Sequence, residues 1–80
     1  MTNPISFLDR QTVQHIKSKY PSGTRVELVC MNDPYNTSLQ PGCLGTVFCV
    51  DDCGTIHVNW DNGSSLGVIP YVDAVKIINN

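Results

Sequence analysis

The sequence lacks the features that mark a membrane or secreted protein. No stretch approaches the ~20 consecutive apolar residues of a membrane span. The first residues, Met1 to Ile5, have neither the basic start nor the apolar run of a secretory signal. Internal repeats and low-complexity segments are also missing. We therefore expect a cytoplasmic protein that makes no membrane contacts.

Positive charge is scarce as well. Five Lys and Arg stand against seven Asp and Glu, which gives a formal net charge of -2. A basic surface is what gives proteins a sequence-independent affinity for phosphate backbones. Binding to nucleic acid is therefore disfavoured.

Regularly spaced cysteine pairs are a third absence. Twelve, five and three residues separate the successive cysteines, whereas structural zinc sites usually use pairs with two intervening residues. Without a signal peptide, the reducing cytosol is expected to keep the thiols free. We expect no metal, no other cofactor and no disulfide. The four residues should instead act as small buried or half-buried apolar side chains: Cys30, Cys43, Cys49 and Cys53.

The length allows a single domain over residues 1–80. Apolar residues make up 41% of the chain, which is enough for a folded core. A chain this short nevertheless buries only ~60–65% of its unfolded surface, so a second surface buried between copies would add stability. We expect a homo-oligomer, in the simplest case a dimer.

A helix is predicted over about residues 6–19. Apolar side chains recur there every three to four residues, and Pro21 to Gly23 ends the pattern. Ser6 is the predicted N-cap, with Asp9 in the first turn. Lys17 and Lys19 stand in the last turn, where they complement the helix dipole.

After Gly23 the apolar period changes from 3.6 to 2, and turn residues separate short strands. Ile56, Val58 and Trp60 share one face of the third of these strands. The predicted strands are residues 24–31, 45–50, 55–60, 65–69 and 74–78. The pattern predicts a mainly β protein, an N-terminal α-helix followed by a five-stranded SH3-like small barrel over about residues 24–78.

Four segments resemble a known family. They are YPSGTRVELV from Tyr20, MNDPY from Met31, PGCLGTV from Pro41 and VDDCGTIHVNWDNGSSLGV from Val50. Together they resemble the domain-of-unknown-function family numbered 4314. The resemblance implies a small cytosolic protein of phages, prophages and conjugative elements of Firmicutes and gut relatives, and implies no activity. The family commonly has other residues at the four cysteine positions, which argues further against a metal site.

The chain has few residues arranged for catalysis. His57 lies on a predicted strand and His15 on the helix, and neither has a Ser or Cys beside it in a triad-like context. Asp51 and Asp52 are adjacent, so their carboxylates should point apart rather than at one bond. Residues 63–67 lack the lysine and the following helix of a phosphate-binding loop. We expect no enzymatic activity.

Binding through the loops is the remaining class of function. The predicted contact residues come from the long first loop, the third strand and the turn after it, with one cation on the first strand: Tyr35, Asn59, Trp60, Asp61, Asn62, Ser64 and Arg25. Tyr71 is a further aromatic anchor. The family context favours a protein that inhibits or sequesters a host factor, as a host-defence antagonist or adaptor. An alternative interpretation gives the predicted contact residues a structural role only, in which the loop residues build turns and Trp60 anchors the core.

Two alternatives stay open. In one, an oligomer holds a small nucleotide immune signal, with aromatic stacking on the base and residues 63–67, Arg25 or Lys76 on phosphate. In the other, weaker alternative the small barrel binds nucleic acid, which the net charge opposes. The residues for that mode would be Arg10, Lys17 and Lys19.

Overall fold

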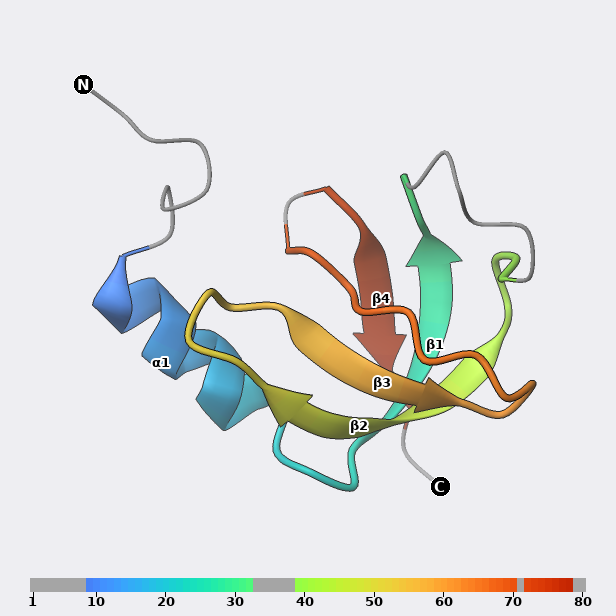
Figure 1. Ribbon diagram of the computed structural model, residues 1–80, viewed down its shortest axis with the longest axis horizontal. Coiled ribbons are helices and arrows are strands. Elements are labelled where there is room, and N and C mark those ends of the chain that lie inside the picture. Colours follow the sequence, from blue (N-terminus) through green and yellow to red (C-terminus); the bar gives the residue numbers. More distant parts are fainter. Residues whose placement is uncertain (1–8, 33–38, 71, 79–80) are drawn as a thin grey trace.

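The computed structural model describes residues 9–32, 39–70 and 72–78 (Figure 1). The elements follow the order α1 (Arg10–Lys19), β1 (Arg25–Cys30), β2 (Leu44–Val50), β3 (Ile56–Trp60) and β4 (Ala74–Ile77). The protein is therefore mainly β with one N-terminal helix, as the sequence predicts. Among these residues, none of the helices has the length and apolar character needed to cross a membrane.

Helix α1 begins about one turn later than predicted. Asp9 is its N-cap, with an extended backbone (φ -80°, ψ 173°) and a carboxylate that accepts the N–H of Thr12 at 2.7 Å. The prediction that Asp9 lies inside the first turn is therefore wrong. Ser6, the predicted N-cap, lies outside the described residues. The cap satisfies an N–H that has no partner within the helix. Lys17 and Lys19 occupy the last turn, as predicted.

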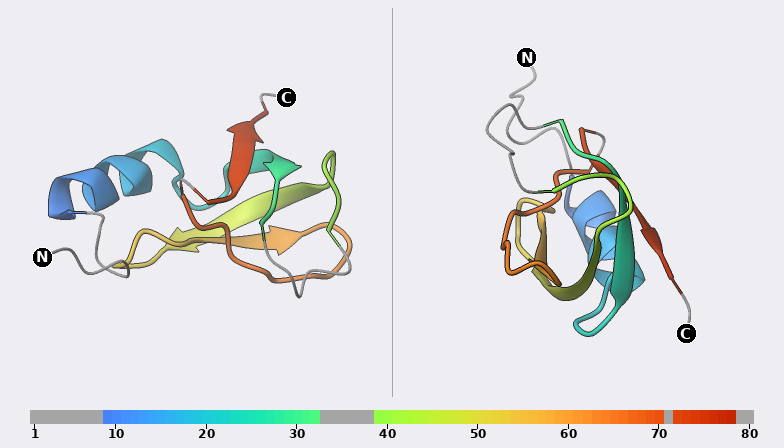
Figure 2. Two further views of the ribbon diagram at one scale, coloured as in Figure 1. Left: turned by 90° about the horizontal axis from the view of Figure 1, so that it is seen from above. Right: turned by 90° about the vertical axis from the view of Figure 1, so that its right-hand side faces the viewer.

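The strands form one antiparallel sheet in the order β3-β2-β1-β4. The described residues form four strands, whereas the sequence predicts five. They do not show the sheet closed into a barrel, because β3 and β4 are the two edge strands and do not pair with each other. Seen from above, β4 stands at a steep angle to β2 and β3 (Figure 2, left). The sheet is thus strongly bent around its inner face.

The predicted strand over residues 65–69 is replaced by a segment with little backbone pairing. Residues 64–68, here called the strap, run beside β3, where Val68 and Ile56 exchange two backbone hydrogen bonds of 2.8 and 2.9 Å. At the other end of the strap, the carbonyl of Ser64 accepts the backbone N–H of Trp60 at 3.0 Å. Between these two contacts the carbonyl of Leu66 accepts the indole N–H of Trp60 at 2.9 Å. A side chain therefore takes a place that a backbone donor would hold in a regular ladder, and the strap still covers the outer edge of β3.

The core lies on the inner face of the bent sheet. Ile56, Val58 and Trp60 of β3 are all buried, which confirms the shared face that the alternation predicts. They pack with apolar residues from α1, β1, β2, the segment before β2 and the strap, which are Ile16, Val26, Leu28, Leu39, Val47 and Val68. Helix α1 contributes Val13 and Ile16 as its buried residues.

The cysteines differ in burial. Cys43 is half-buried and packs against the core, as expected for a small apolar side chain. Cys30, Cys49 and Cys53 are exposed, so that expectation is wrong for them. Cys30 and Cys49 each follow a register shift in the sheet, and such shifts break the alternation of inward and outward side chains. Cys53 lies in the β2–β3 turn, outside both strands.

Candidate functional site

The outer face of the sheet brings together three of the predicted contact residues. Arg25 of β1 lies opposite Thr46 of β2, and Thr46 lies opposite Asn59 of β3. Residues directly opposite in an antiparallel pair share a face. The neighbouring row, Val26, Gly45 and Trp60, is buried, so the row that holds Arg25 and Asn59 faces outward.

Arg25 is held by a bidentate ion pair with Asp61, the residue after β3. The two guanidinium nitrogens donate to the two carboxylate oxygens at 2.9 and 2.7 Å, and Nη1 also donates to Thr46 Oγ1 at 2.8 Å. The hydrogen bond from Arg25 lowers the pKa of the Asp61 carboxyl, and the same bond raises the pKa of the guanidinium. The pair is partly exposed, so it fixes the geometry of the face more than it stabilises the fold.

Phe48 presents the largest exposed apolar surface on this face. It follows Thr46 by two residues on β2, at the register shift between Val47 and Cys49, and 62% of it is exposed. Phe48 is not among the contact residues that the sequence predicts. The available signal was an aromatic residue in phase with Thr46 and out of phase with Val47. We call Arg25, Thr46, Phe48, Asn59 and Asp61 the outer-face cluster.

The turn after β3 is organised by its own side chains. The Oδ1 atom of Asn62 accepts the N–H of Ser64 at 2.9 Å, and the Oγ atom of Ser64 accepts the N–H of Leu66 at 3.5 Å. The N–H of Gly63 donates to the carbonyl of Trp60 at 2.9 Å. These contacts are what the turn-building interpretation of Asn62 and Ser64 requires.

The remaining predicted contact residues are not part of the outer-face cluster. Trp60 is 3% exposed and anchors the core, so its ring is not available at the surface. Tyr35 and Tyr71 lie outside the described residues. The predicted surface therefore divides into an outer strand face with Arg25, Asn59 and Asp61, and a turn with Asn62 and Ser64.

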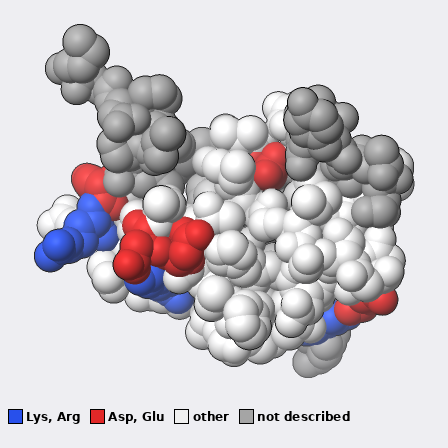
Figure 3. Space-filling view, in the orientation of Figure 1, with Lys and Arg blue, Asp and Glu red and all other residues white. Residues whose placement is uncertain are grey.

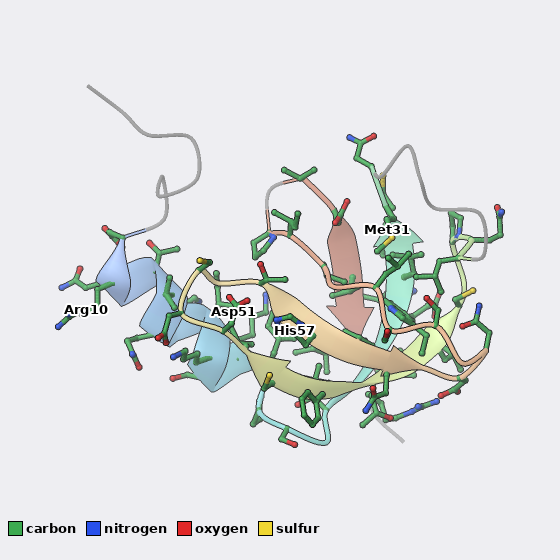
Figure 4. The ribbon with its side chains drawn as sticks, in the orientation of Figure 1. Arg10, Met31, Asp51 and His57 are labelled. Atoms are coloured by element: carbon green, nitrogen blue, oxygen red, sulfur yellow. The ribbon has the colours of Figure 1, made fainter. Side chains whose placement is uncertain are left out.

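A second polar group lies at the other end of β3. His57 Nε2 is 2.9 Å from Asp51 Oδ2, and Asp51 Oδ1 accepts the N–H groups of Cys53 and Thr55 (Figure 4). Partial burial raises the pKa of the Asp51 carboxyl, but the hydrogen bonds from His57, Thr55 and Cys53 outweigh burial and leave that pKa below its ordinary value. The carboxylate therefore closes the β2–β3 turn.

Asp52 serves a different partner. Its carboxylate forms an ion pair with Lys17 of α1 at 2.9 Å, which links the helix to the β2–β3 turn. The two adjacent carboxylates thus act on separate groups, as the sequence predicts. Figure 3 shows charged side chains gathered near α1 and at the Arg25 end of the sheet, with few between them on that face.

The fold and the outer-face cluster show which class of protein this is, namely a small, mainly β protein with an N-terminal helix and an exposed strand face. The family described as a domain of unknown function, DUF4314, matches residues 9–78, and the chain belongs to that family. No curated protein and no solved structure matches the chain.

Proposed function

We propose that the protein is a non-catalytic binding protein of phage or mobile-element origin that inhibits or sequesters a host protein through the outer-face cluster. The proposed origin rests on the family resemblance. The observation that carries the proposed activity is the exposed Phe48 ring, two residues along β2 from Thr46, which accepts a hydrogen bond from the Arg25 of the fixed Arg25–Asp61 pair. We also infer that the fold is an SH3-like small barrel in which the strap takes the place of the fourth strand.

The chemistry of the outer-face cluster suits a protein partner. Aromatic and arginine side chains dominate the binding energy of protein interfaces, and rigid elements lose little entropy on binding. Phe48 and Arg25 lie on paired strands, and Arg25 is already oriented by Asp61 and Thr46. A partner would therefore meet an ordered surface with an apolar centre and a polar rim.

Catalysis has less support from the described residues. His57 and Asp51 form a pair whose carboxylate is engaged in the β2–β3 turn. Among the described residues, Asp51 is the side chain that bonds to the His57 ring, and no Ser, Thr or Cys does, so the pair has no nucleophile in place.

The two alternatives are also less well supported. The N–H groups of Gly63 and Ser64 donate within the turn, which occupies donors that a phosphate would need. Lys17 and Arg25 are paired with aspartates, which reduces the positive field available to nucleic acid.

The test is quantitative affinity capture from a lysate of a Firmicutes host. The native protein should retain one host protein in stoichiometric amount. Phe48→Ser and Asn59→Ala should reduce the retained amount at least tenfold, since truncating a hot-spot residue costs about 2 kcal/mol or more. Val72→Ser is the matched control, because Val72 is also exposed but lies before β4, outside the outer-face cluster.

Two further variants separate contact residues from turn builders. If they are contact residues and not turn builders, Tyr35→Ala and Ser64→Ala should keep the melting temperature within about one or two degrees of the parent, since substitutions away from structural contacts change stability by less than ~0.5 kcal/mol. Reduced capture at unchanged stability would extend the contact surface to the loops. Equal capture by the native protein, Phe48→Ser and Asn59→Ala would contradict the proposal, and a thermal shift with nucleotides alone would favour the nucleotide alternative.

A further inference from the structure

A cavity opens on the inner side of the sheet, away from the outer-face cluster. It has a volume of about 310 Å³ and is lined by residues of α1 and of the segment that leads into β4. Its floor is made of core residues, namely Ile16 of α1, Ile56 of β3 and Val68 of the strap. Pockets for small organic ligands begin at about 300 Å³ and are mostly apolar, so this cavity has room for a body of one or two fused rings.

The rim of the cavity carries the polar groups. His15 and Lys19 stand one helical turn apart on α1 and both line the opening. The ammonium of Lys19 lies 5.5 Å from the centroid of the Tyr20 ring, which also lines the cavity. This cation–π contact holds the positive charge beside an aromatic wall.

Asp73 is the acidic residue of the lining, and its charge is largely engaged. Its Oδ1 atom accepts the N–H of Asn32 at 2.7 Å, and its Oδ2 atom accepts the N–H of Ile69 at 3.0 Å. Lys19 has no carboxylate within ion-pair distance among the described residues. An apolar floor with an unpaired cation at its mouth is complementary to a flat apolar body that carries one negative charge.

We propose that this cavity binds a small organic anion, a ring system of one or two fused rings with a carboxylate, sulfonate or phosphate group. The rings would pack on Ile16, Ile56 and Val68, and the anionic group would face Lys19 and His15. The site is independent of the outer-face cluster, because its floor belongs to the opposite face of the sheet.

A matched pair of fluorescent probes tests both parts of the site. 8-Anilinonaphthalene-1-sulfonate and N-phenyl-1-naphthylamine have the same rings, and only the first carries a negative charge. The native protein, with its cooperative melting transition intact, should bind the sulfonate at one site per chain. Lys19→Met should weaken the sulfonate at least fivefold and leave the uncharged probe within twofold. Lys17→Met is the control, because Lys17 pairs with Asp52 and does not line this cavity.

A second variant tests the location. Ala74 lines the cavity with an exposed side chain, so Ala74→Phe should block both probes while the melting transition stays cooperative. Amide shifts on binding should centre on Ile16, Ile56 and Val68. The proposal is overturned if the native protein shows no saturable binding, if Lys19→Met and Lys17→Met bind the sulfonate equally, or if Ala74→Phe binds both probes normally.

Competition identifies the source of the natural ligand. Adenosine 5′-monophosphate and indole-3-carboxylate both have a flat ring system and an anionic group. Displacement of the bound sulfonate by one of them supports the proposal and assigns the ligand to nucleotides or to aromatic acids. Displacement by neither compound counts against a ligand of this class.

Discussion

At the scale of single residues, Trp60 connects the core to the strap. Its ring is buried beside Gly45, its partner on β2, and its indole N–H donates to the carbonyl of Leu66. A buried Trp with its N–H satisfied adds both apolar area and a hydrogen bond. No other side chain of the described core makes such a double contact with the strap.

Replacement of Trp60 should therefore be the most costly truncation. Trp60→Ala should lower the free energy of unfolding by ~3–5 kcal/mol, because it removes the ring and leaves a cavity. Trp60→Phe keeps an aromatic ring and should cost less, about 1–2 kcal/mol for the lost hydrogen bond to Leu66. Urea denaturation followed by circular dichroism measures both values. An unchanged midpoint for Trp60→Ala would place the ring outside the core.

The carboxylate of Asp51 should make stability depend on acid pH. Its folded-state pKa is lowered, so the stability that it contributes is present above its unfolded pKa of about 3.9 and is lost as the pH falls through the lower folded value. The difference in unfolding free energy between the native protein and Asp51→Asn should shrink as the pH falls below about 4. Urea denaturation at a series of pH values tests this, and a constant difference would show that the charge of Asp51 has no role.

At the scale of elements, β2 carries a glycine because β3 approaches it closely. An ideal Cβ atom on Gly45 would lie 2.5 Å from Val58 Cγ1 and 2.8 Å from Trp60 Cε3. Both of these atoms belong to buried side chains that have little space to shift. Gly45 therefore sets how closely β2 and β3 pack on the inner face.

Gly45→Ala should overpack this contact. We expect a loss of about 1–3 kcal/mol in unfolding free energy, the usual cost of an extra methyl group in a packed core. Cys49→Ala, a small change at an exposed position of the same strand, is the control and should stay within ~0.5 kcal/mol. Equal midpoints for the two variants would mean that β3 moves away from β2 without cost.

The elements show which features a single sequence can predict. The helix and the four strands follow from apolar periodicity, and the buried face of β3 follows from strict alternation at Ile56, Val58 and Trp60. The strap satisfies the same alternation pattern. In the structure it forms one isolated bridge with β3, and its Leu66 carbonyl accepts the Trp60 indole N–H, a tertiary contact that local propensity does not contain.

The candidate site could be predicted only in part, because residue types can be read from the sequence but the pairing between strands cannot. The residue types of Arg25 and Asn59 predict contact residues, but the pairing of Arg25 with Asp61 depends on the strand order that places β1 and β3 on either side of β2. The outward position of Phe48 follows from its alternation with Thr46 and Val47, so the sequence did contain that part of the signal. Which outward residues of the three strands lie together depends on strand order and register, and these emerge only from the fold.

At the scale of the whole molecule, the small core still predicts self-association. Large apolar side chains stay exposed in the described part of the chain, among them Phe48, Val29 and Ile77. Light scattering coupled to size-exclusion chromatography should give a mass of twice 8.8 kDa, independent of dilution through the micromolar range. A concentration-independent mass of 8.8 kDa would show that the single chain is stable alone.

The bond between Trp60 and Leu66 also gives the molecule a built-in optical reporter. Trp60 is the only tryptophan of the chain, so all indole emission comes from the point where the strap meets β3. Detachment of the strap would wet the indole and shift its emission to longer wavelengths, whereas melting of α1 would be seen in the far-ultraviolet helix signal. The two signals recorded in one titration would therefore tell whether the strap opens before the helix or together with it.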